Sequence, residues 1–144
     1  MTTTSKNFNI KNGLDVGANS VINSSGQWTG QLSSYKENVT VIGTVSGATQ
    51  NIDLSLSNIF DITLGNNVTF TFTNPPSSGI AQNATIILRQ DGSGNRTASF
   101  TNAKYTDGQT PVLSTGINQI DVLTFWTTNG GTSYFGTFAM ANVS

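Results

Sequence analysis

Three neighbouring stretches of the sequence alternate apolar and polar residues with a period of two, and this pattern constrains the fold more than any other feature. The stretches are NIDLSL (51–56), IFDITL (59–64) and VTFTFT (68–73). Successive side chains of a β-strand point to opposite faces of a sheet, so strict alternation is typical of a strand with one buried face. The apolar residues of each stretch, Leu56 included, are therefore expected on the core side.

Other parts of the chain carry strand and turn signals but no convincing helix pattern. Consecutive branched apolar residues at 86–88 predict a strand there. The turn residues at 65–67 (Gly-Asn-Asn) and at 129–131 (Asn-Gly-Gly) each predict a hairpin between the runs that flank them. The remaining predicted strands are VTVIGTV (39–45), IDVLTFWTT (120–128) and TSYFGTFAM (132–140).

About eight short strands without intervening helices indicate an all-β fold, an antiparallel β-sandwich or jelly-roll. This head domain is expected to cover residues 35–144. Residues 1–34 are expected to form a separate, turn-rich extension with small β fragments. The length of 144 residues suits one such domain with a short extension.

The N-terminal extension is too poor in apolar residues to fold by itself. Its central stretch, FNIKNGLDVGANSVINSSGQWTG (8–30), offers only seven large apolar side chains. Ordering a residue costs roughly 1–2 kcal/mol of backbone entropy, whereas a buried large apolar side chain contributes about 1.5–3 kcal/mol. Two interpretations stay open: a disordered tail, or a segment buried against copies of itself or a larger particle. In the second, the anchoring and assembly residues are Phe8, Ile10, Leu14, Val16 and Trp28.

Composition argues against most kinds of enzyme and cofactor. The chain contains no Cys and no His, which removes thiol chemistry, cysteine zinc sites and the commonest general base. We therefore expect no catalytic residue, no metal and no cofactor. Six Lys and Arg stand against seven Asp and Glu without a basic cluster, so nucleic-acid binding is not expected either. With only 9% charged residues, solubility rests on 55 Thr, Asn and Ser residues, which suit sheet surfaces and turns.

Targeting signals are absent from the sequence. The first residues lack an apolar run of signal-peptide length, and no segment of 18 apolar residues occurs. We therefore expect a protein made in a cytoplasm without an export signal and without a membrane partner. Release within a particle would still carry it out of the cell.

The few acidic residues do not form a convincing site. The loop at 91–95 (Asp-Gly-Ser-Gly-Asn) looks superficially like a calcium loop but lacks alternating acidic ligands and a closing Glu. Asp53, Asp61 and Asp121 lie in predicted strands, opposite the apolar residues, and nothing brings two of them together as in a glycosidase. We interpret them as solvent-facing or subunit-facing. The Asn-x-Ser/Thr sequons are explained by chance in a chain rich in Asn and Thr.

Aromatic residues of the predicted C-terminal hairpin lie on both of its faces. Phe125 and Trp126 alternate on one strand, and Tyr134 and Phe135 alternate on the other. One face is expected in the core. The other favours a subunit interface, because large exposed apolar patches usually have a partner. The alternative is a glycan-stacking platform, in which Trp126, Tyr134 and Tyr105 are surface aromatics.

Long phrases of the sequence resemble virion structural and tail-fibre proteins of tailed bacteriophages, especially cyanophages. In the extension, residues 8–17 match an apolar-x-apolar-x-Asn-Gly-Leu-x-Val-Gly phrase, and residues 22–30 match an Ile-x-x-Ser-Gly-x-Trp-x-Gly phrase. The head carries three more matching phrases, YKENVTVIG (35–43), NIDLSLSNIFDITLGNNVTFTFTNPPSSG (51–79) and INQIDVLTFWTTNGGTSYFGTFA (117–139).

The resemblance implies a structural role in the virion, usually as a homotrimer, and no reaction. The partners would be further copies of the chain, other virion proteins and, where the head reaches the host, a surface glycan. Long tail fibres of this group carry many shaft repeats, whereas this chain has room for one. A short fibre, a head or neck appendage, or a decoration protein therefore fits the length as well. In the family arrangement the extension is the anchor and the β head projects.

Overall fold

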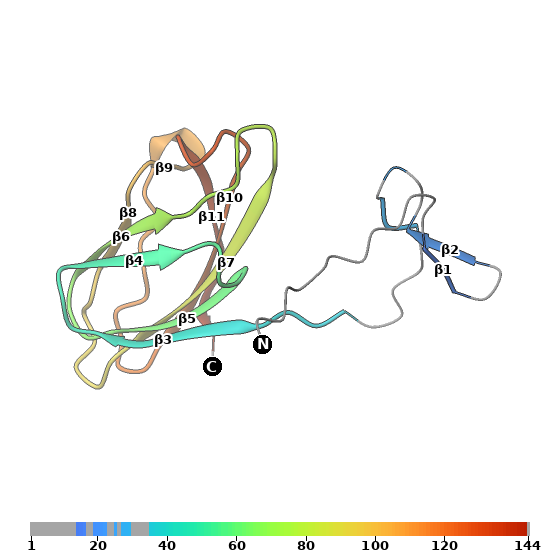
Figure 1. Ribbon diagram of the computed structural model, residues 1–144. Coiled ribbons are helices and arrows are strands. Elements are labelled where there is room, and N and C mark those ends of the chain that lie inside the picture. The colour runs from blue at the N-terminus through green and yellow to red at the C-terminus, as the bar shows by residue number, and fades with distance from the viewer. Residues whose placement is uncertain (1–13, 17–18, 23–24, 26, 30–34, 144) are drawn as a thin grey trace, which may run out of the picture. The chain divides into compact units, whose positions relative to one another are not determined.

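A computed structural model describes residues 14–16, 19–22, 25, 27–29 and 35–143. The chain divides into two units, Met1–Lys36 and Glu37–Ser144. In the first unit, β1 (Leu14–Val16) pairs antiparallel with β2 (Asn19–Ile22) (Figure 1). The last residue of β2 also forms an antiparallel bridge with Trp28.

The second unit, called the head below, consists mainly of strands. The all-β fold is confirmed, and the strands predicted at 39–45, 59–64 and 68–73 have the predicted bounds. The only helical element among the described residues of the head is a short 3-10 turn, η1 (Thr106–Gly108). The strands are β3 (Val39–Val45), β4 (Thr49–Asp53), β5 (Ile59–Leu64), β6 (Val68–Thr73), β7 (Gln82–Gln90), β8 (Ala98–Phe100), β9 (Ala103–Lys104), β10 (Ile120–Thr127) and β11 (Tyr134–Val143).

The strands of the head form two sheets. The larger sheet has the order β3-β5-β7-β10-β11-β9, and the smaller sheet has the order β4-β6-β8. Strands β3, β5 and β7 run parallel to one another, as do β4, β6 and β8, whereas β10 runs antiparallel to both β7 and β11. From β3 to β8 the chain therefore alternates between the two sheets. Figure 1 traces this path by colour, from cyan through green to yellow.

This winding corrects the hairpin predicted at residues 65–67. Strands β5 and β6 belong to different sheets, so the short link between them crosses from one sheet to the other. Strand β5 pairs with β3 and β7, and β6 pairs with β4 and β8. Alternation of period two specifies which face of a strand is buried but not which strand lies beside it. Within the head, the predicted antiparallel order holds only for β7, β10 and β11.

Side chains from both sheets meet in one core. Aromatic rings connect the sheets: the Phe72 ring on β6 lies 5.2 Å from the Phe125 ring on β10 and 4.5 Å from the Tyr134 ring on β11, measured between centroids. Such pairs contribute about 0.5–1.5 kcal/mol beyond their area burial. The shared core gives each sheet one inner and one outer face. The fully buried apolar residues are Ile52, Phe60, Ile62, Leu64, Phe70, Ile86, Leu88, Leu123 and Phe125.

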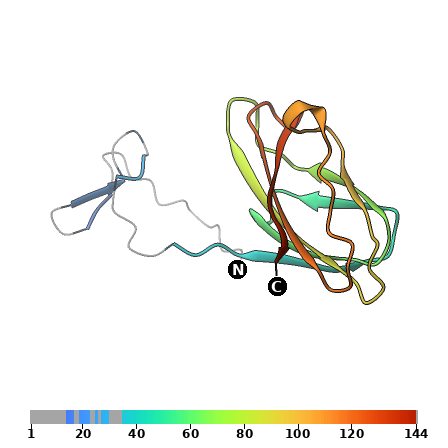
Figure 2. The same cartoon turned by 180° about the vertical axis from the view of Figure 1, so that it is seen from behind.

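The C-terminal hairpin is confirmed, because β10 and β11 pair antiparallel. Asn129 closes the turn: its Oδ1 accepts hydrogen bonds from the Thr127 hydroxyl at 3.0 Å and from the Ser133 N–H at 3.1 Å. Gly130 and Gly131 follow with φ angles of +67° and +76°, a conformation that favours glycine. Figure 2, the view from behind, shows β11 in dark red along the head.

The predicted position of Leu56 is wrong. Strand β4 ends at Asp53, whose Oδ1 accepts hydrogen bonds from the Ser55 N–H at 2.9 Å and the Ser55 hydroxyl at 2.7 Å. This local pairing turns the chain, as Asp side chains often do at turns. Leu54 still reaches the core, whereas Leu56 is exposed.

Candidate functional site

The outer face of the larger sheet carries a band of apolar side chains. Val122 on β10 pairs with Ile87 on β7 and with Met140 on β11. Residues directly opposite one another on paired strands point to the same face, with Cβ atoms about 4.5–5.5 Å apart. The band extends along β10 to Ile120. Val41 on β3 lies on the same face, separated from Ile87 by Asp61 of β5. We call these residues the apolar band: Val41, Ile87, Ile120, Val122, Met140 and Val143.

Solvent reaches the apolar band in the isolated chain. The exposed fraction is 73% for Val41 and 53% for Met140. Burying a large apolar side chain contributes about 1.5–3 kcal/mol, so the band offers several kcal/mol to any partner that covers it. Exposed apolar patches are characteristic of interaction sites. In this band Asp61 lies between Val41 and Ile87.

One ion pair lies within the same face. The Arg89 guanidinium donates from Nε to Asp61 Oδ1 at 2.7 Å and from Nη2 to Asp61 Oδ2 at 2.8 Å, a bidentate geometry. The hydrogen bond with Asp61 raises the pKa of Arg89 above its usual value. The two opposite charges cancel, so this part of the face would present no net charge to a partner.

The far end of β10 and β11 carries two exposed aromatic rings. Trp126 and Phe135 are paired residues, 46% and 41% exposed, with ring centroids 4.9 Å apart and planes tilted by 40°. Trp126 also pairs with Asn83 of β7. We call Trp126 and Phe135 the aromatic pair. They confirm the predicted alternation, because Phe125 and Tyr134 beside them are buried.

A polar hollow of about 370 Å³ includes Asn83, the residue opposite Trp126, among its lining residues. Trp126 and Phe135 do not themselves line it. Side chains from the start of β7 and from the segments before β3 and β5 line it. Gln82 Nε2 donates to the Leu54 carbonyl at 2.7 Å and approaches Asn58 Oδ1 at 3.5 Å. The principal polar lining residues are Glu37, Asn58, Gln82, Asn83 and Thr85.

The outer face of the smaller sheet differs in chemistry. On β6 the threonines alternate with buried phenylalanines. Thr69 Oγ1 lies 3.0 Å from Ser99 Oγ, and Thr71 Oγ1 lies 3.1 Å from Thr101 Oγ1, so hydroxyls bond across the strands. We call this outer face of β4, β6 and β8 the hydroxyl face.

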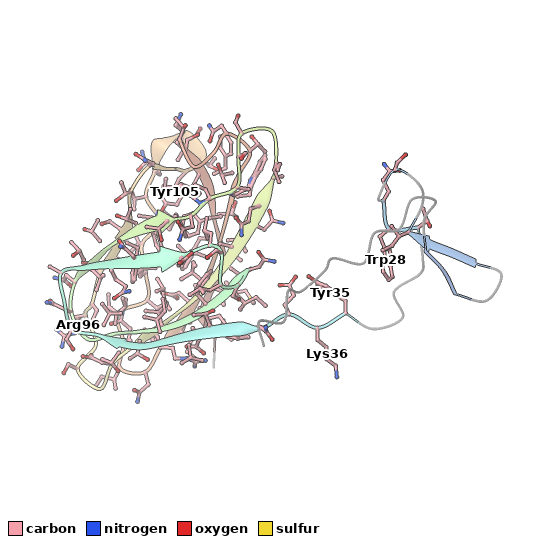
Figure 3. The ribbon with its side chains drawn as sticks, in the orientation of Figure 1. Trp28, Tyr35, Lys36, Arg96 and Tyr105 are labelled. Carbon is pink, nitrogen blue, oxygen red and sulfur yellow. The ribbon has the colours of Figure 1, made fainter. Side chains whose placement is uncertain are left out.

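Three of the four residues predicted as an interface or glycan platform are not free on the surface. Phe125 and Tyr134 are buried in the core, so the prediction that Tyr134 is a surface aromatic is wrong. Tyr105 is half-buried next to η1, with its ring 6.3 Å from that of Phe125 (Figure 3). Burial raises the pKa of Tyr105 to about 12. Only Trp126 is exposed as predicted.

The predicted anchoring residues are described only in part. Phe8 and Ile10 lie outside the described residues. Leu14 and Val16 are the ends of β1. Trp28 is exposed and stands on the first unit (Figure 3). Their predicted role in anchoring stays a prediction.

The acidic residues lie apart in different roles. Asp121 was expected opposite the apolar residues, but its side chain is buried. Its Oδ2 accepts the Ser114 N–H at 2.7 Å, and its Oδ1 accepts the Ser114 hydroxyl at 2.7 Å and the Asn142 N–H at 3.0 Å. These three hydrogen bonds offset the cost of burying the Asp121 carboxylate. Hydrogen bonds from Ser55 and Asn74 hold the pKa of Asp53 below its usual value, while Asp61 pairs with Arg89.

The Asp91 loop is held by its own contacts. Asp91 Oδ2 accepts a hydrogen bond from Arg96 Nη2 at 2.9 Å, and this bond lowers the pKa of Asp91. Its Oδ1 accepts the Ser93 and Gly94 N–H groups, each at 2.9 Å. Within the part of the chain that the structure describes, no three acidic side chains gather as metal ligands would, and no helix is long and apolar enough to span a membrane.

Comparisons with protein-family models, with curated proteins and with solved structures give no significant match.

Sequence reasoning missed two parts of this site. Phe135 is the exposed partner of Trp126, and the alternation along β11 already placed it opposite Tyr134. Glu37 and Asn83 come together in the polar hollow only because β7 lies beside β5. No local sequence signal predicts that parallel pairing.

Proposed function

We propose that the protein is a structural component of a tailed-bacteriophage virion and assembles as a homotrimer. The observation that supports this proposal best is the apolar band on the outer face of the larger sheet. The partner is a second copy of the same chain. The resemblance of the sequence to virion and tail-fibre proteins supports two parts of the proposal, the location in a phage particle and the assembly of three copies.

The outer face of the larger sheet limits the contact that the head can make. Six strands at a spacing of about 4.8 Å span about 24 Å, and an eight-residue strand measures about 26 Å. The face thus presents at most about 600 Å² in projection, which is less than the roughly 800 Å² per partner that stable interfaces bury. In a closed ring each copy divides this face between two neighbours, so in this proposal the N-terminal extension adds to the contact.

The chemistry of the face suits a like partner. The Asp61–Arg89 pair already satisfies both charges within one protomer, so two such faces can meet without unpaired charge. The hydroxyl face lies on the other sheet and stays in water. We infer that the head is a two-layered β-sandwich whose larger sheet faces the assembly axis. The jelly-roll alternative fits less well, because jelly-rolls are built from antiparallel pairs.

The N-terminal extension supplies the attachment in this proposal. Phe8, Ile10, Leu14 and Val16 anchor the protein to other virion proteins. Replacing all four with Ser is expected to leave the head folded and to abolish incorporation into particles. Unchanged incorporation would contradict this role.

The direct test of self-assembly is the molar mass in solution by light scattering. The full chain is expected at three times its 15.2 kDa mass. A chain lacking residues 1–34 shows whether the head alone holds the trimer. A monomer at all concentrations would reject the assembly, and a dimer would reject the three-fold arrangement.

A glycan-binding module for host attachment is the second candidate. The observation that favours it is the exposed aromatic pair beside a polar hollow. An exposed Trp next to unpaired polar groups is the usual composition of a small-ligand site.

A further inference from the structure

The structure points to a sugar-binding site in the polar hollow: we propose that Glu37, Asn58 and Asn83 bind the hydroxyls of a neutral pyranose, and that its ring packs on Trp126. This inference rests on the glycan-binding candidate above and names its site and ligand class, whereas the assembly proposal stands apart from it. The hollow is also separate from the apolar band. Trp126 lies four residues from Val122 along β10, about 13 Å at ~3.3 Å per residue.

The polar groups of the hollow have unused hydrogen-bonding capacity. No described residue forms a hydrogen bond with the side chain of Glu37 or Asn83, and both are exposed. A carboxylate accepts two hydroxyl donors, and an amide both donates and accepts. Gln82, by contrast, is held by the Leu54 carbonyl, which leaves the wall beneath the hollow fixed. Adjacent hydroxyls on a sugar ring match this combination of acceptors and donors.

The aromatic ring supplies the apolar part of the site. Trp126 lies directly opposite Asn83, so its side chain stands about 4.5–5.5 Å from that of Asn83 at Cβ. Packing against Phe135 holds the indole in place, with the two rings 4.9 Å apart. A rigid, amphipathic Trp surface suits the C–H face of a pyranose.

The size of the hollow limits the ligand to a small one. Its volume of about 370 Å³ lies at the low end of the roughly 300–1,000 Å³ typical of ligand pockets. One sugar ring, or two in a linear oligosaccharide, fits such a volume. An extended polymer would be held at only one short segment.

Charge selects a neutral sugar over an acidic one. Glu37 is the charged residue of the hollow. Arg89 and Arg96 are engaged by Asp61 and Asp91. Lys104 on β9 pairs with Phe135 on β11 and lies three strand spacings, or about 14 Å, from Asn83 on β7. Lys36 precedes Glu37 in the chain but is not among the residues that line the hollow, so a carboxylate inside the hollow would face the like charge of Glu37.

The test uses the full chain and soluble methyl glycosides. Methyl glucoside, methyl galactoside and methyl N-acetylglucosaminide are titrated by saturation-transfer NMR, with methyl glucuronide as the acidic probe. We expect millimolar binding of at least one neutral glycoside and weaker binding of the glucuronide. Asn83→Ala and Trp126→Ala should each weaken the neutral interaction about tenfold, the size of one lost hydrogen bond or ring contact.

Asn51→Ala is the matched control, because Asn51 is an exposed strand amide on the hydroxyl face. It should bind as the unmodified chain does. Glu37→Gln should narrow the preference for neutral over acidic glycosides.

Absence of neutral-glycoside binding, or equal binding by Asn83→Ala, would overturn the proposal. Preferential binding of the glucuronide would also overturn it. The molar mass of each variant is measured separately, so a failed sugar site is distinguished from a failed assembly.

Discussion

The two outer faces of the head are built from the same alternating pattern but carry opposite chemistry. Both sheets turn one side toward the shared core. On the larger sheet the other side presents the apolar band, whereas on the smaller sheet it presents hydroxyls bonded across strands. In the proposed trimer the apolar outer face serves assembly, and the hydroxyl face stays in contact with water.

Adjacent residues on one strand give the largest contrast between inner and outer faces. Phe125→Ala is expected to lower the free energy of unfolding by about 3–5 kcal/mol, because it leaves a cavity in the core. Trp126→Ala should lower it by about 1 kcal/mol or less in the dissociated protomer, since exposed positions contribute little. Urea denaturation at low protein concentration measures both. Equal losses would mean that Trp126 is covered within the protomer.

Tyr105 lies half-buried at the edge of the core between the two sheets, and its ionisation tests that burial. Its pKa is raised from 10.0 to about 12, so the folded state favours the neutral phenol. The stability that this provides is complete below pH 10 and is lost as the pH rises through 12. It amounts to up to about 2 kcal/mol once solvent screening is considered. Tyr105→Phe should flatten the loss of stability between pH 10 and 12, measured by thermal melting; an unchanged alkaline profile would contradict the burial.

The Asp61–Arg89 pair allows the larger sheet's outer face to be compared in the dissociated protomer and in the proposed assembly. In the dissociated protomer a double-mutant cycle of Asp61→Asn and Arg89→Gln should give a coupling of about 1 kcal/mol or less, because the pair is partly exposed. In the assembly each single variant leaves one unpaired charge in a contact, so dissociation should increase more than protomer stability falls. Sedimentation across a concentration series measures this difference. Identical effects on both quantities would place the pair outside the interface.

The hydroxyl face should give the smallest effect. Thr71→Val removes the hydrogen bond to Thr101 while keeping a branched side chain in the strand. We expect a change of about 0.5 kcal/mol or less in the free energy of unfolding, and no change in molar mass. If this variant no longer assembled, the interface would lie on the smaller sheet and not on the larger sheet as proposed.

The alternation of apolar residues was sufficient to predict most strands and the buried face of each. It placed Phe70 inward with Thr71 outward. For Phe125 and Trp126 it predicted opposite faces but left open which of the two is buried. It did not predict which strands pair, because pairing depends on contacts between segments far apart in the chain. The link at residues 65–67 has the composition of a hairpin turn, yet the parallel partners of β5 and β6 determine its path.

The candidate site was predicted to a smaller extent for the same reason. Trp126 could be identified from its strand, but its neighbour Asn83 comes from β7 and depends on sheet order. Asp121 was predicted opposite the apolar residues, whereas it shares the inner face of β10 with Leu123 and Phe125. Its partners are backbone and hydroxyl donors of Ser114 and Asn142, which no sequence pattern brings to it.

The most direct measurement is the molar mass of a double variant on each face. Val41→Glu with Met140→Glu places two charges on the apolar band at exposed positions, so the protomer should remain folded. Thr49→Glu with Ser99→Glu is the matched control on the edge strands of the hydroxyl face. We expect a folded monomer for the first variant and a trimer for the second. A trimer for the first variant, or a monomer for the control, would contradict this expectation.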